Sequence, residues 1–389
     1  MMNKKQNIKE LLDGVSVEWK SLGEVANYEQ PTKYLVKSKN YNNEFNIPVL
    51  TAGKTFILGY TNEIDGIYKA SISPVVIFDD FTTANKWVDF DFKAKSSAMK
   101  MITSKDESEF LLKYIYYWLN TLPSDLIDGD HKRQWISNFS KKIIPIPPLK
   151  VQSEIVKILD NFTELTAELT AELTAELTAR KKQYSYYRDT LLSFKDDKVE
   201  WKKLGEVAQY SKDRISFEKL NENNYIGVDN LLQNREGKTV STKVPTKGNH
   251  TKYIPKDILI GNIRPYLKKI WYANCNGGTN GDVLVIRITN DNLLPRYLYQ
   301  ILADDNFFIY NMNHAKGAKM PRGNKTKILD YLIPIPPLKK QKEIVTILDK
   351  FDTLTNSISK GLPYEIELRQ KQYEYYRDML LTFPKDSDE

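Results

Sequence analysis

The sequence predicts an α+β fold with a pseudo-two-fold internal repeat, in which two globular α/β domains are joined by a long antiparallel two-helix coiled coil. Three observations predict this architecture. The chain has 389 residues, more than one ordinary domain needs. Several blocks of sequence occur twice. One of these blocks begins a run of helically spaced apolar residues that continues over roughly 45 residues, too long for a helix inside one compact domain.

The repeated blocks divide the chain into two halves. The segment Val17–Tyr28, "VEWKSLGEVANY", recurs as Val199–Tyr210, "VEWKKLGEVAQY". The segment Ile144–Phe162, "IPIPPLKVQSEIVKILDNF", recurs as Ile333–Phe351. Matches of this length do not arise by chance, so each half is a variable globular block followed by a nearly constant segment. The predicted divisions are a first globular domain (1–148), a first spacer helix (149–198), a second globular domain (199–338) and a second helix (339–389).

The order of the repeats is cyclic. "KKQYSYYRDTLLSF", Lys181–Phe194, matches the segment Arg369–Phe383 near the end of the chain. "ELLDGVSVEW" near the N-terminus also echoes "TLLSFKDDKVEW" in the middle, as though the chain had been opened inside a ring. We therefore expect the two halves to be related by a pseudo-two-fold axis, with the chain ends close together.

The variable blocks, Glu29–Ile143 and Ser211–Leu332, have different sequences but the same mixed composition of elements. In the first, "SPVVIFDDF" and "KWVDFDFKA" are typical of strands and "EFLLKYIYYWLNTL" of a helix. In the second, "DILIGNIRPYLKKIWYA" and "GDVLVIRIT" predict strands and "LLPRYLYQILADDNFFIYNM" predicts helix. Neither block has an internal period, so their topology is left open.

The nearly constant segments predict long helices. The prolines of "IPIPPL" exclude helix, and after them the apolar residues step by three and four. We predict one helix from about Lys150 to Phe194 and a second from about Lys339, which Gly361 and Pro363 should kink or interrupt. The predicted coiled-coil or subunit-interface positions are Ile155, Leu159, Phe162, Leu165, Leu169, Leu173, Leu177, Ile344, Ile347, Leu348 and Phe351.

The first of these helices contains three perfect copies of the tetrapeptide TAEL, Thr166–Leu177. Each copy adds about 6 Å of helix and, because four residues exceed one turn of 3.6, rotates the rest of the chain by about 40°. The repeats are either a simple helical spacer or a ruler between two binding blocks. The two interpretations are compatible.

Composition excludes several classes of protein. The single cysteine, Cys275, excludes an intramolecular disulfide framework, and three scattered histidines give no metal-ligand spacing. There is no signal peptide and no apolar stretch long enough for a membrane span, so we expect a cytoplasmic protein. A formal net charge of +7 permits a polyanionic partner without requiring one.

No catalytic motif is convincing. Gly53, Lys54 and Thr55 resemble the end of a phosphate-binding loop, but Pro48 stands where that loop needs a glycine. Asp79, Asp80, Asp91 and Lys93 could imitate a metal-dependent nuclease centre, although Asp alternating with Phe is also typical of a half-exposed strand. We therefore predict no catalytic residue, no metal site and no chemistry by this chain alone.

A basic segment precedes "IPIPPL" in each half, Gly129–Lys142 and His314–Lys327, and Arg133 and Arg322 occupy matching positions. Lys and Arg suit phosphate and guanine contacts, and Gln or Asn can pair with adenine, whereas solvated surface charge is the alternative for each residue. The candidate DNA-binding residues are Lys33, Lys54, Lys86, Lys132, Arg133, Gln134, Trp135, Arg264, Tyr266, Lys268, Lys269, Lys316, Lys319, Arg322, Asn324 and Lys325.

This arrangement closely resembles the specificity (S) subunit of Type I restriction-modification systems, and the TAEL units resemble those of the branch that uses them as a spacer. Two variable blocks each begin with "EWK-LGEV" and end with "IPIPPL--Q-EIV-ILD-F", and the pattern closes with "KQY-YYRD-LL-F". The resemblance covers essentially the whole chain. It implies two target recognition domains, each reading half of a split DNA sequence, and constant helices that set the gap between them.

The resemblance also implies partners. Two modification (methyltransferase) subunits would dock on the constant helices and use S-adenosylmethionine to methylate adenine, and restriction (motor-nuclease) subunits that need ATP and Mg would join them. No cofactor is expected on this chain itself. Two other interpretations stay open: a coiled-coil scaffold carrying two protein-binding modules, whose partner binding would depend little on salt, and a stand-alone nuclease.

Overall fold

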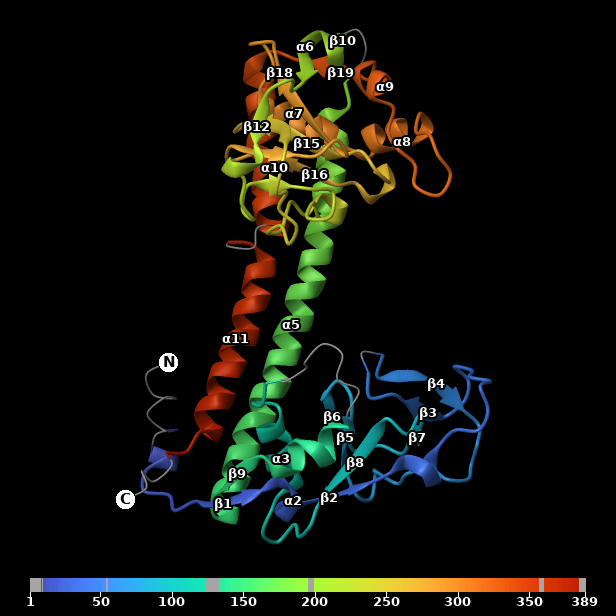
Figure 1. Ribbon diagram of the computed structural model, residues 1–389, viewed down its shortest axis with the longest axis vertical. Coiled ribbons are helices and arrows are strands. Elements are labelled where there is room, and N and C mark those ends of the chain that lie inside the picture. The colour runs from blue at the N-terminus through green and yellow to red at the C-terminus, as the bar shows by residue number, and fades with distance from the viewer. Residues whose placement is uncertain are drawn as a thin grey trace. The chain divides into compact units, whose positions relative to one another are not determined.

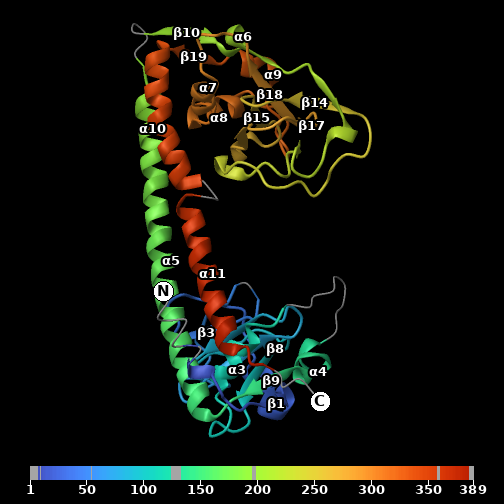
Figure 2. The same ribbon diagram turned by 90° about the vertical axis from the view of Figure 1, so that its left-hand side faces the viewer.

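The computed structural model describes residues 8, 10–53, 55–123, 133–194, 199–356 and 360–384. The chain forms two compact units (Figures 1 and 2). The first contains Met1–Leu169 together with Leu368–Glu389, and the second contains Thr170–Glu367. Both ends of the chain therefore belong to the first unit, as the cyclic repeat predicts.

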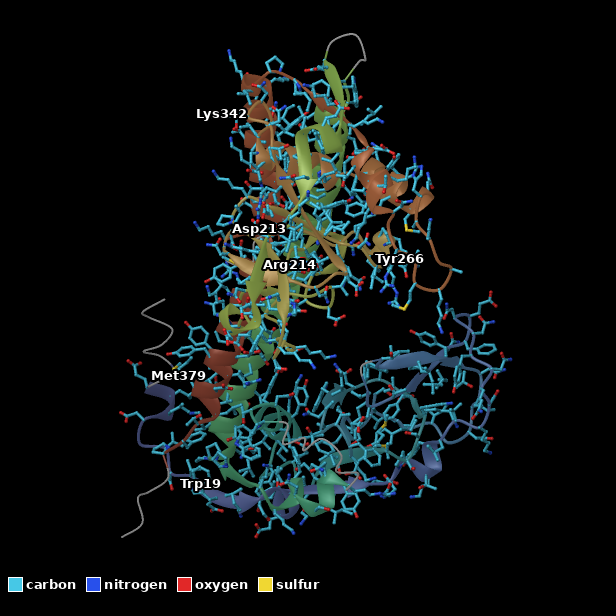
Figure 3. All side chains as sticks on the ribbon, turned by 45° about the horizontal axis from the view of Figure 1, so that its top comes forward. Trp19, Asp213, Arg214, Tyr266, Lys342 and Met379 are labelled. Atoms are coloured by element: carbon cyan, nitrogen blue, oxygen red, sulfur yellow. The ribbon has the colours of Figure 1, made fainter. Side chains whose placement is uncertain are left out.

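The first unit is built on antiparallel strands. β1 (Glu18–Ser21), which carries Trp19 (Figure 3), pairs with β9 (Ile143–Ile146). The four strands of its main sheet, in spatial order, are β2 (Ala26–Glu29), β8 (Met99–Ser104), β5 (Val75–Asp79) and β6 (Asn85–Val88). A smaller sheet contains β4 (Ile57–Thr61), β3 (Ile47–Leu50) and β7 (Lys93–Ala94), with β3 and β7 parallel. The predicted strand around Val75 is confirmed. The strand predicted over 86–94 is split, because β6 ends at Val88 and β7 belongs to the smaller sheet.

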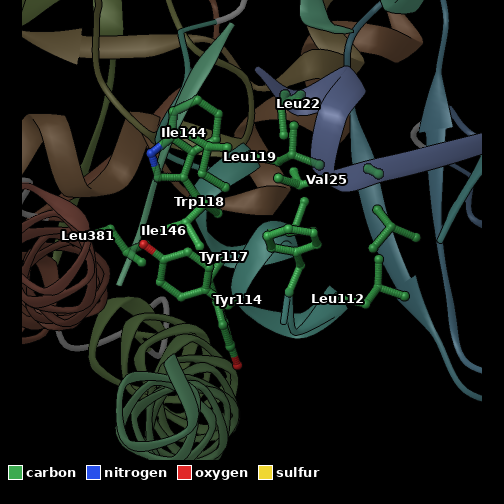
Figure 4. Packing of buried hydrophobic residues seen from close by; sticks show 14 of the residues in the cluster. Leu22, Val25, Leu112, Tyr114, Tyr117, Trp118, Leu119, Ile144, Ile146 and Leu381 are labelled. Carbon is green, nitrogen blue, oxygen red and sulfur yellow. The ribbon is translucent and has the colours of Figure 1, made fainter. Parts of the chain in front are cut away.

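Short helices cover these sheets: α2 (Leu22–Val25), η1 (Pro31–Tyr34), α3 (Leu112–Leu119), α4 (Gln134–Ser137) and η2 (Phe139–Lys141). Helix α3 brings Leu112, Tyr114 and Trp118 against the apolar side chains of α2 and β9, which form the core shown in Figure 4. Leu381 from the end of the chain packs into the same core (Figure 4). The first unit is therefore completed by the C-terminal segment.

The second unit repeats the central arrangement. β10 (Glu200–Lys203) pairs with β19 (Leu332–Ile335) as β1 pairs with β9. The main sheet has the order β11 (Ala208–Tyr210), β18 (Val283–Ile288), β15 (Ile258–Gly261) and β16 (Ile270–Tyr272), which matches strand for strand the order β2, β8, β5, β6. The topology of the main sheet, which the sequence left open, is thus the same in both halves.

The peripheral parts of the second unit differ from those of the first. Its outer sheet has four strands, β12 (Arg214–Ser216), β14 (Asn249–Tyr253), β17 (Gly277–Thr279) and β13 (Tyr225–Ile226). Its short helices are α6 (Leu204–Val207), η3 (Phe217–Lys219), η4 (Gln233–Arg235), η5 (Pro265–Leu267), α7 (Pro295–Leu302), α8 (Asp305–Asn313) and α9 (Lys325–Leu329).

The long helices agree with the prediction. α5 spans Leu149–Leu192, so the boundary between the two units falls inside it. The predicted interruption is confirmed, because α10 (Leu338–Asn356) ends before Gly361 and α11 (Leu362–Leu381) begins just after it. Pro363 lies in the first turn of α11, where its missing N–H costs no hydrogen bond.

Each unit contains a pair of packed helices. In the first unit the rings of Phe162 and Tyr376 stack at 5.2 Å with an interplanar angle of 5°. In the second unit Phe351 stacks on Tyr187 at 5.2 Å. Phe351 and Tyr376 lie 189 positions after Phe162 and Tyr187 respectively, so the two contacts are equivalent under the cyclic repeat.

Two buried glutamines join the helices to the globular cores. Gln152 on α5 and Gln341 on α10 are both 0% exposed. The side-chain oxygen of each accepts a hydrogen bond from a backbone N–H, that of Leu111 or Leu294, and the side-chain nitrogen donates to two carbonyls. Because every amide hydrogen is paired, these glutamines fix the position of each helix without an unsatisfied polar group.

Only part of the predicted coiled-coil seam is deeply buried. Ile155, Leu159, Ile344 and Leu348 are 0% exposed, because each unit's globular core covers this end of its helix. The remaining predicted positions Phe162, Leu169, Leu173, Leu177 and Phe351 are half-buried.

Leu165 and Ile347 are exposed, with 46% and 39% of their surface open. Ile347 precedes buried Leu348 by one residue, which turns it about 100° away from that side of the helix. Leu165 lies just past Phe162, the last residue of α5 that packs against the first core.

Candidate nucleic-acid interface

In the second unit, two basic segments that are far apart in sequence lie side by side. Ile263 forms a β-bridge with Arg322, and the N–H of Arg264 donates to the carbonyl of Pro321 at 2.7 Å. Arg322 also exchanges two backbone hydrogen bonds with Lys316, at 2.8 and 2.9 Å, which closes a loop. Residues 262–269 and 316–325 therefore form one surface, which we call the basic loop pair.

The first segment of the basic loop pair holds its side chains rigidly. Arg264 and Lys268 both have positive φ, 54° and 51°, and they flank the single turn η5. Left-handed backbone costs a residue with a Cβ about 1 kcal/mol or more, so packing around η5 must hold it in place. Tyr266 lies in the centre of this turn, is 50% exposed and is labelled in Figure 3.

The cations of the basic loop pair differ in how far they are neutralised. Lys268 pairs with Asp305 at 2.7 Å, and Arg322 pairs with Asp282 at 3.1 Å. The Lys269 ammonium donates to the carbonyl of Val228 at 2.6 Å, and burial lowers the pKa of Lys269. The remaining cations are exposed and have no ion-pair partner within the described ranges: Arg264, Lys316, Lys319 and Lys325. Of these four, the three lysines are the best placed to meet phosphates.

Asn324 has a structural role that was not predicted. Its side-chain oxygen caps α9 by accepting hydrogen bonds from the N–H groups of Thr326 and Lys327, at 3.1 and 3.3 Å. A bidentate contact with adenine needs that same oxygen as an acceptor, so the predicted adenine pairing competes with the cap. An asparagine directly before a short helix-forming run is the signal that could have indicated a cap.

Gly323 joins the two segments through close packing, and no pattern in the sequence indicates this role. A Cβ at this position would lie 2.5 Å from Oδ1 of Asn311 and 2.7 Å from Oδ1 of Asn262. Its N–H donates to the Asn262 carbonyl at 3.0 Å. Both asparagine side-chain oxygens are buried and accept no hydrogen bond from the described residues. Only glycine allows this approach.

In the first unit, α4 places the predicted residues on different sides. Arg133 precedes α4 and is exposed. Trp135 is only 1% exposed and its ring contacts Phe78 at 5.3 Å, so it packs the core and does not lie on the surface proposed for DNA. Gln134 is 8% exposed and is likewise removed from that surface. The tryptophan is buried because its large apolar ring fills the space between α4 and β5.

A buried ion pair holds α4 in place. The backbone N–H of Gln134 donates to the carbonyl of Asp80 at 2.9 Å, and the backbone N–H of Trp135 donates to Oδ1 of Asp80 at 2.8 Å. The other carboxylate oxygen of Asp80 lies 3.1 Å from the Lys100 ammonium, and both side chains are almost fully buried. Lys100 also donates to Gln30 and to the carbonyl of Ser97. Asp80 and Lys100 therefore position the segment that carries Arg133.

The other first-unit candidates are scattered. Lys33 on η1 is exposed and pairs with Glu29 at 3.4 Å, and Lys86 on β6 lies 5.7 Å from the ring of Phe56. Lys54 and Lys132 lie outside the described residues. The first unit thus gives no assembled basic surface comparable to the basic loop pair within its described part.

The four residues of the nuclease alternative do not form one centre. Asp79 accepts from the N–H groups of Phe81 and Thr82, and Asp80 pairs with Lys100. Asp91 pairs with Lys69. Lys93 is buried and pairs with Glu63. Burial alone would raise the pKa of Glu63, but hydrogen bonds from the N–H groups of Ser38 and Lys37 and from the Lys93 ammonium lower that pKa overall.

Within the described ranges, no group of three or more His, Cys, Asp or Glu side chains could hold a metal ion. Every helix there is also too short or too polar to span a membrane.

Comparison with known families decides the assignment. A family model described as "Type I restriction modification DNA specificity domain" matches residues 15–179 and again residues 196–368. The chain belongs to this specificity-subunit family. The two matches coincide with the two halves of the internal repeat, and both include a variable block and the helix that comes after it.

Specificity subunits with similar sequences are known in several bacteria. The chain is 52% identical over 403 residues to the "Type I restriction enzyme EcoR124I/EcoR124II specificity subunit" of Escherichia coli, covering 99% of this chain and 98% of that protein. It is 35% identical over 411 residues to the "Putative type I restriction enzyme specificity subunit S.HindORF215P" of Haemophilus influenzae, covering 98% of this chain and all of that protein.

Solved structures show the same fold at low sequence identity. The S subunit of a type I restriction-modification system from M. genitalium superposes with a TM-score of 0.52 at 15% identity, covering 96% of this chain and 98% of that one. A chain from a structural study of type I system assembly gives a TM-score of 0.61 at 16% identity, covering 95% of this chain and 98% of that one. The mixed helix and sheet fold with two repeated domains is therefore that of specificity subunits.

Proposed function

We propose that this chain is the DNA-recognition subunit of a type I restriction-modification complex, in which each variable domain reads one half of a bipartite target. One observation carries the proposal. The two units share the strand order of the main sheet, yet their outer sheets and candidate contact residues differ. Two readers on one scaffold with different side chains imply two half-sites of different sequence, so the target is asymmetric and interrupted.

The basic loop pair supports DNA contact in the second domain. Its unpaired lysines suit phosphates, and the rigid turn that presents Arg264 and Tyr266 suits contact with base edges. Arg133, at the start of α4, is the corresponding candidate in the first domain. A fixed backbone reduces the conformational entropy lost on binding, which favours a precise fit to one sequence.

The chain's role in this proposal is non-catalytic. Methylation of adenine would be carried out by two modification subunits that hold S-adenosylmethionine and dock along the conserved helices. Cleavage would need restriction subunits with ATP and Mg. The dispersed placement of Asp79, Asp80, Asp91 and Lys93 supports this division of labour.

The test is to co-express the chain with the modification subunit from its own locus in a methylation-free host and to map modified adenines by single-molecule sequencing. We expect a split, asymmetric motif with one methylated adenine in each half. The control is the same modification subunit with a different specificity subunit. Methylation in the control but none with this chain would reject the proposal and favour the coiled-coil scaffold.

A further inference from the structure

The second unit has a pocket at the C-terminal end of α5 that DNA recognition does not explain. Its volume is about 530 Å³. Its lining is mixed: apolar and aromatic side chains from several elements share the wall with polar groups, which include the carboxylates of Asp189 and Asp304. The lining residues are Asp189, Leu192, Ser193, Phe194, Trp201, Ile301, Asp304, Asn306, Tyr331, Leu332 and Pro334. We call it the acidic pocket.

The equivalent residues of the first unit are covered. Leu380, Leu381 and Phe383, which lie 189 positions after Leu191, Leu192 and Phe194, are 0%, 3% and 5% exposed. Their second-unit counterparts are only half-buried. The repeat therefore buries these side chains in one unit and leaves them partly open in the other.

The covering element in the first unit is a short amphipathic helical segment near the N-terminus. Residues 8 and 10–12 are helical, and this segment lies beside the end of α11 in both Figures 1 and 2. Ile8 is 4% exposed within the first core, and Leu11 and Leu12 pack against that core. Among the described residues, no such segment packs on the corresponding part of the second core.

The acidic pocket also contains polar atoms without partners. Asp304 is 5% exposed; one of its carboxylate oxygens caps α8 by accepting from the N–H of Asn306 at 2.8 Å. The other oxygen, Oδ2, accepts no hydrogen bond from any described residue, and the indole N–H of Trp201 is likewise unpaired. Burial, and then the neighbouring Asp304 carboxylate, raise the pKa of Asp189, so an added cation would be favourable here.

We propose that the acidic pocket docks a short amphipathic helix of the modification subunit, with a lysine or arginine of that helix paired with the exposed carboxylate of Asp189, beside buried Asp304. Charge complementarity favours a cation, and the apolar part of the lining favours a helix with one apolar side, as the N-terminal segment provides in the first unit. Phosphates are disfavoured, because two carboxylates would repel them. This inference rests on the proposed function.

The test uses the complex of the full chain with its modification subunit. The double variant Asp189→Asn with Asp304→Asn removes both charges and keeps the α8 cap, since Asn caps helices as well as Asp. Ser193→Trp, at an exposed position of the rim, fills the pocket instead. The matched control is Asp378→Asn, because Asp378 is the repeat counterpart of Asp189. The counterpart of Asp304 is Thr121, which has no charge to remove, so the control needs only one substitution.

Sedimentation across a dilution series gives the dissociation constant of the complex for each variant. We expect both pocket variants to weaken it at least tenfold, and Asp378→Asn to change it less than twofold. An unchanged constant in Ser193→Trp, or an equal loss in the control, overturns the proposal. If the wild-type chain directs methylation and the pocket variants bind the modification subunit normally, only the docking proposal is rejected. If the wild-type chain binds no modification subunit, the proposed function itself is rejected.

Discussion

At the scale of single residues, two buried residues that are not candidate DNA contacts position the candidate interface. Gly323 permits the close contact between the two segments of the basic loop pair, and Lys100 neutralises the buried Asp80 that holds α4. Neither residue is expected to touch DNA. Both determine where Arg322 and Arg133, two of the proposed DNA contacts, lie.

Gly323→Ala should weaken both folding and DNA binding. The added methyl group would overlap the side-chain oxygens of Asn311 and Asn262, and overpacking of this kind costs about 1–3 kcal/mol. Urea unfolding and DNA titration of the same preparation measure the two effects. Gly281→Ala is the matched control, because a Cβ there meets no atom within 4 Å. Equal behaviour of the two variants would show that the close contact is unimportant.

Lys100→Met should lower the free energy of unfolding by about 3–5 kcal/mol, because it leaves the Asp80 carboxylate buried without its cation. Chemical denaturation at neutral pH provides the measurement. Exposed Lys105, substituted in the same way, should change stability by no more than about 0.5 kcal/mol. A decrease well below the expected range in Lys100→Met would mean that water or a rearranged partner replaces the ammonium.

At the scale of elements, the basic loop pair shows why clustered charge alone does not define an interface. Its two segments, 262–269 and 316–325, are distant in sequence, and β-bridges bring them together. The exposed cations Lys316 and Lys319 lie on one of these segments and are free of ion pairs with described residues. We therefore propose that these two lysines contact phosphates and that Arg264 and Tyr266 read bases.

The double variant Lys316→Ala with Lys319→Ala should weaken DNA binding about equally for target and non-target sequences. The slope of log affinity against log salt should become shallower by about 0.9 for each phosphate that a lysine no longer neutralises. Fluorescence anisotropy over a salt series measures both quantities. Lys342→Ala on α10 is the control, since Lys342 is exposed but lies on a different element (Figure 3). If the double variant weakened binding to the target sequence only, these lysines would contact bases and not phosphates.

Elements are easier to predict from this sequence than surfaces are. The long helix and its interruption at Gly361 and Pro363 follow from local periodicity and backbone chemistry, and both are observed. Trp135 and Gln134 adjoin basic residues, which suggests DNA contact, but their sequence does not show which side of α4 faces the core. The contact between residues 262–269 and 316–325 depends on the packing of a whole domain, which no local pattern contains.

At the scale of the whole molecule, the TAEL repeats should act as a ruler. Inserting one further unit after Leu177 adds about 6 Å to α5, which compares with about 3.4 Å per base pair of DNA. We expect the same two half-sites with a gap longer by about one or two base pairs, as read by methylation mapping. Inserting TAEL in the loop just before β14, away from α5, should leave the gap unchanged. If the gap between the half-sites stayed unchanged in the helix variant, the repeats would be only a passive spacer.

The cyclic construction has a genetic consequence. Tyr376, Leu380, Leu381 and Phe383 lie close to the end of the chain, yet their side chains are part of the first unit's core. A stop codon introduced just before the codon for Tyr376 would therefore damage the first unit, most of which is encoded far upstream. Such a truncation would leave the intervening second domain with every residue of its own core.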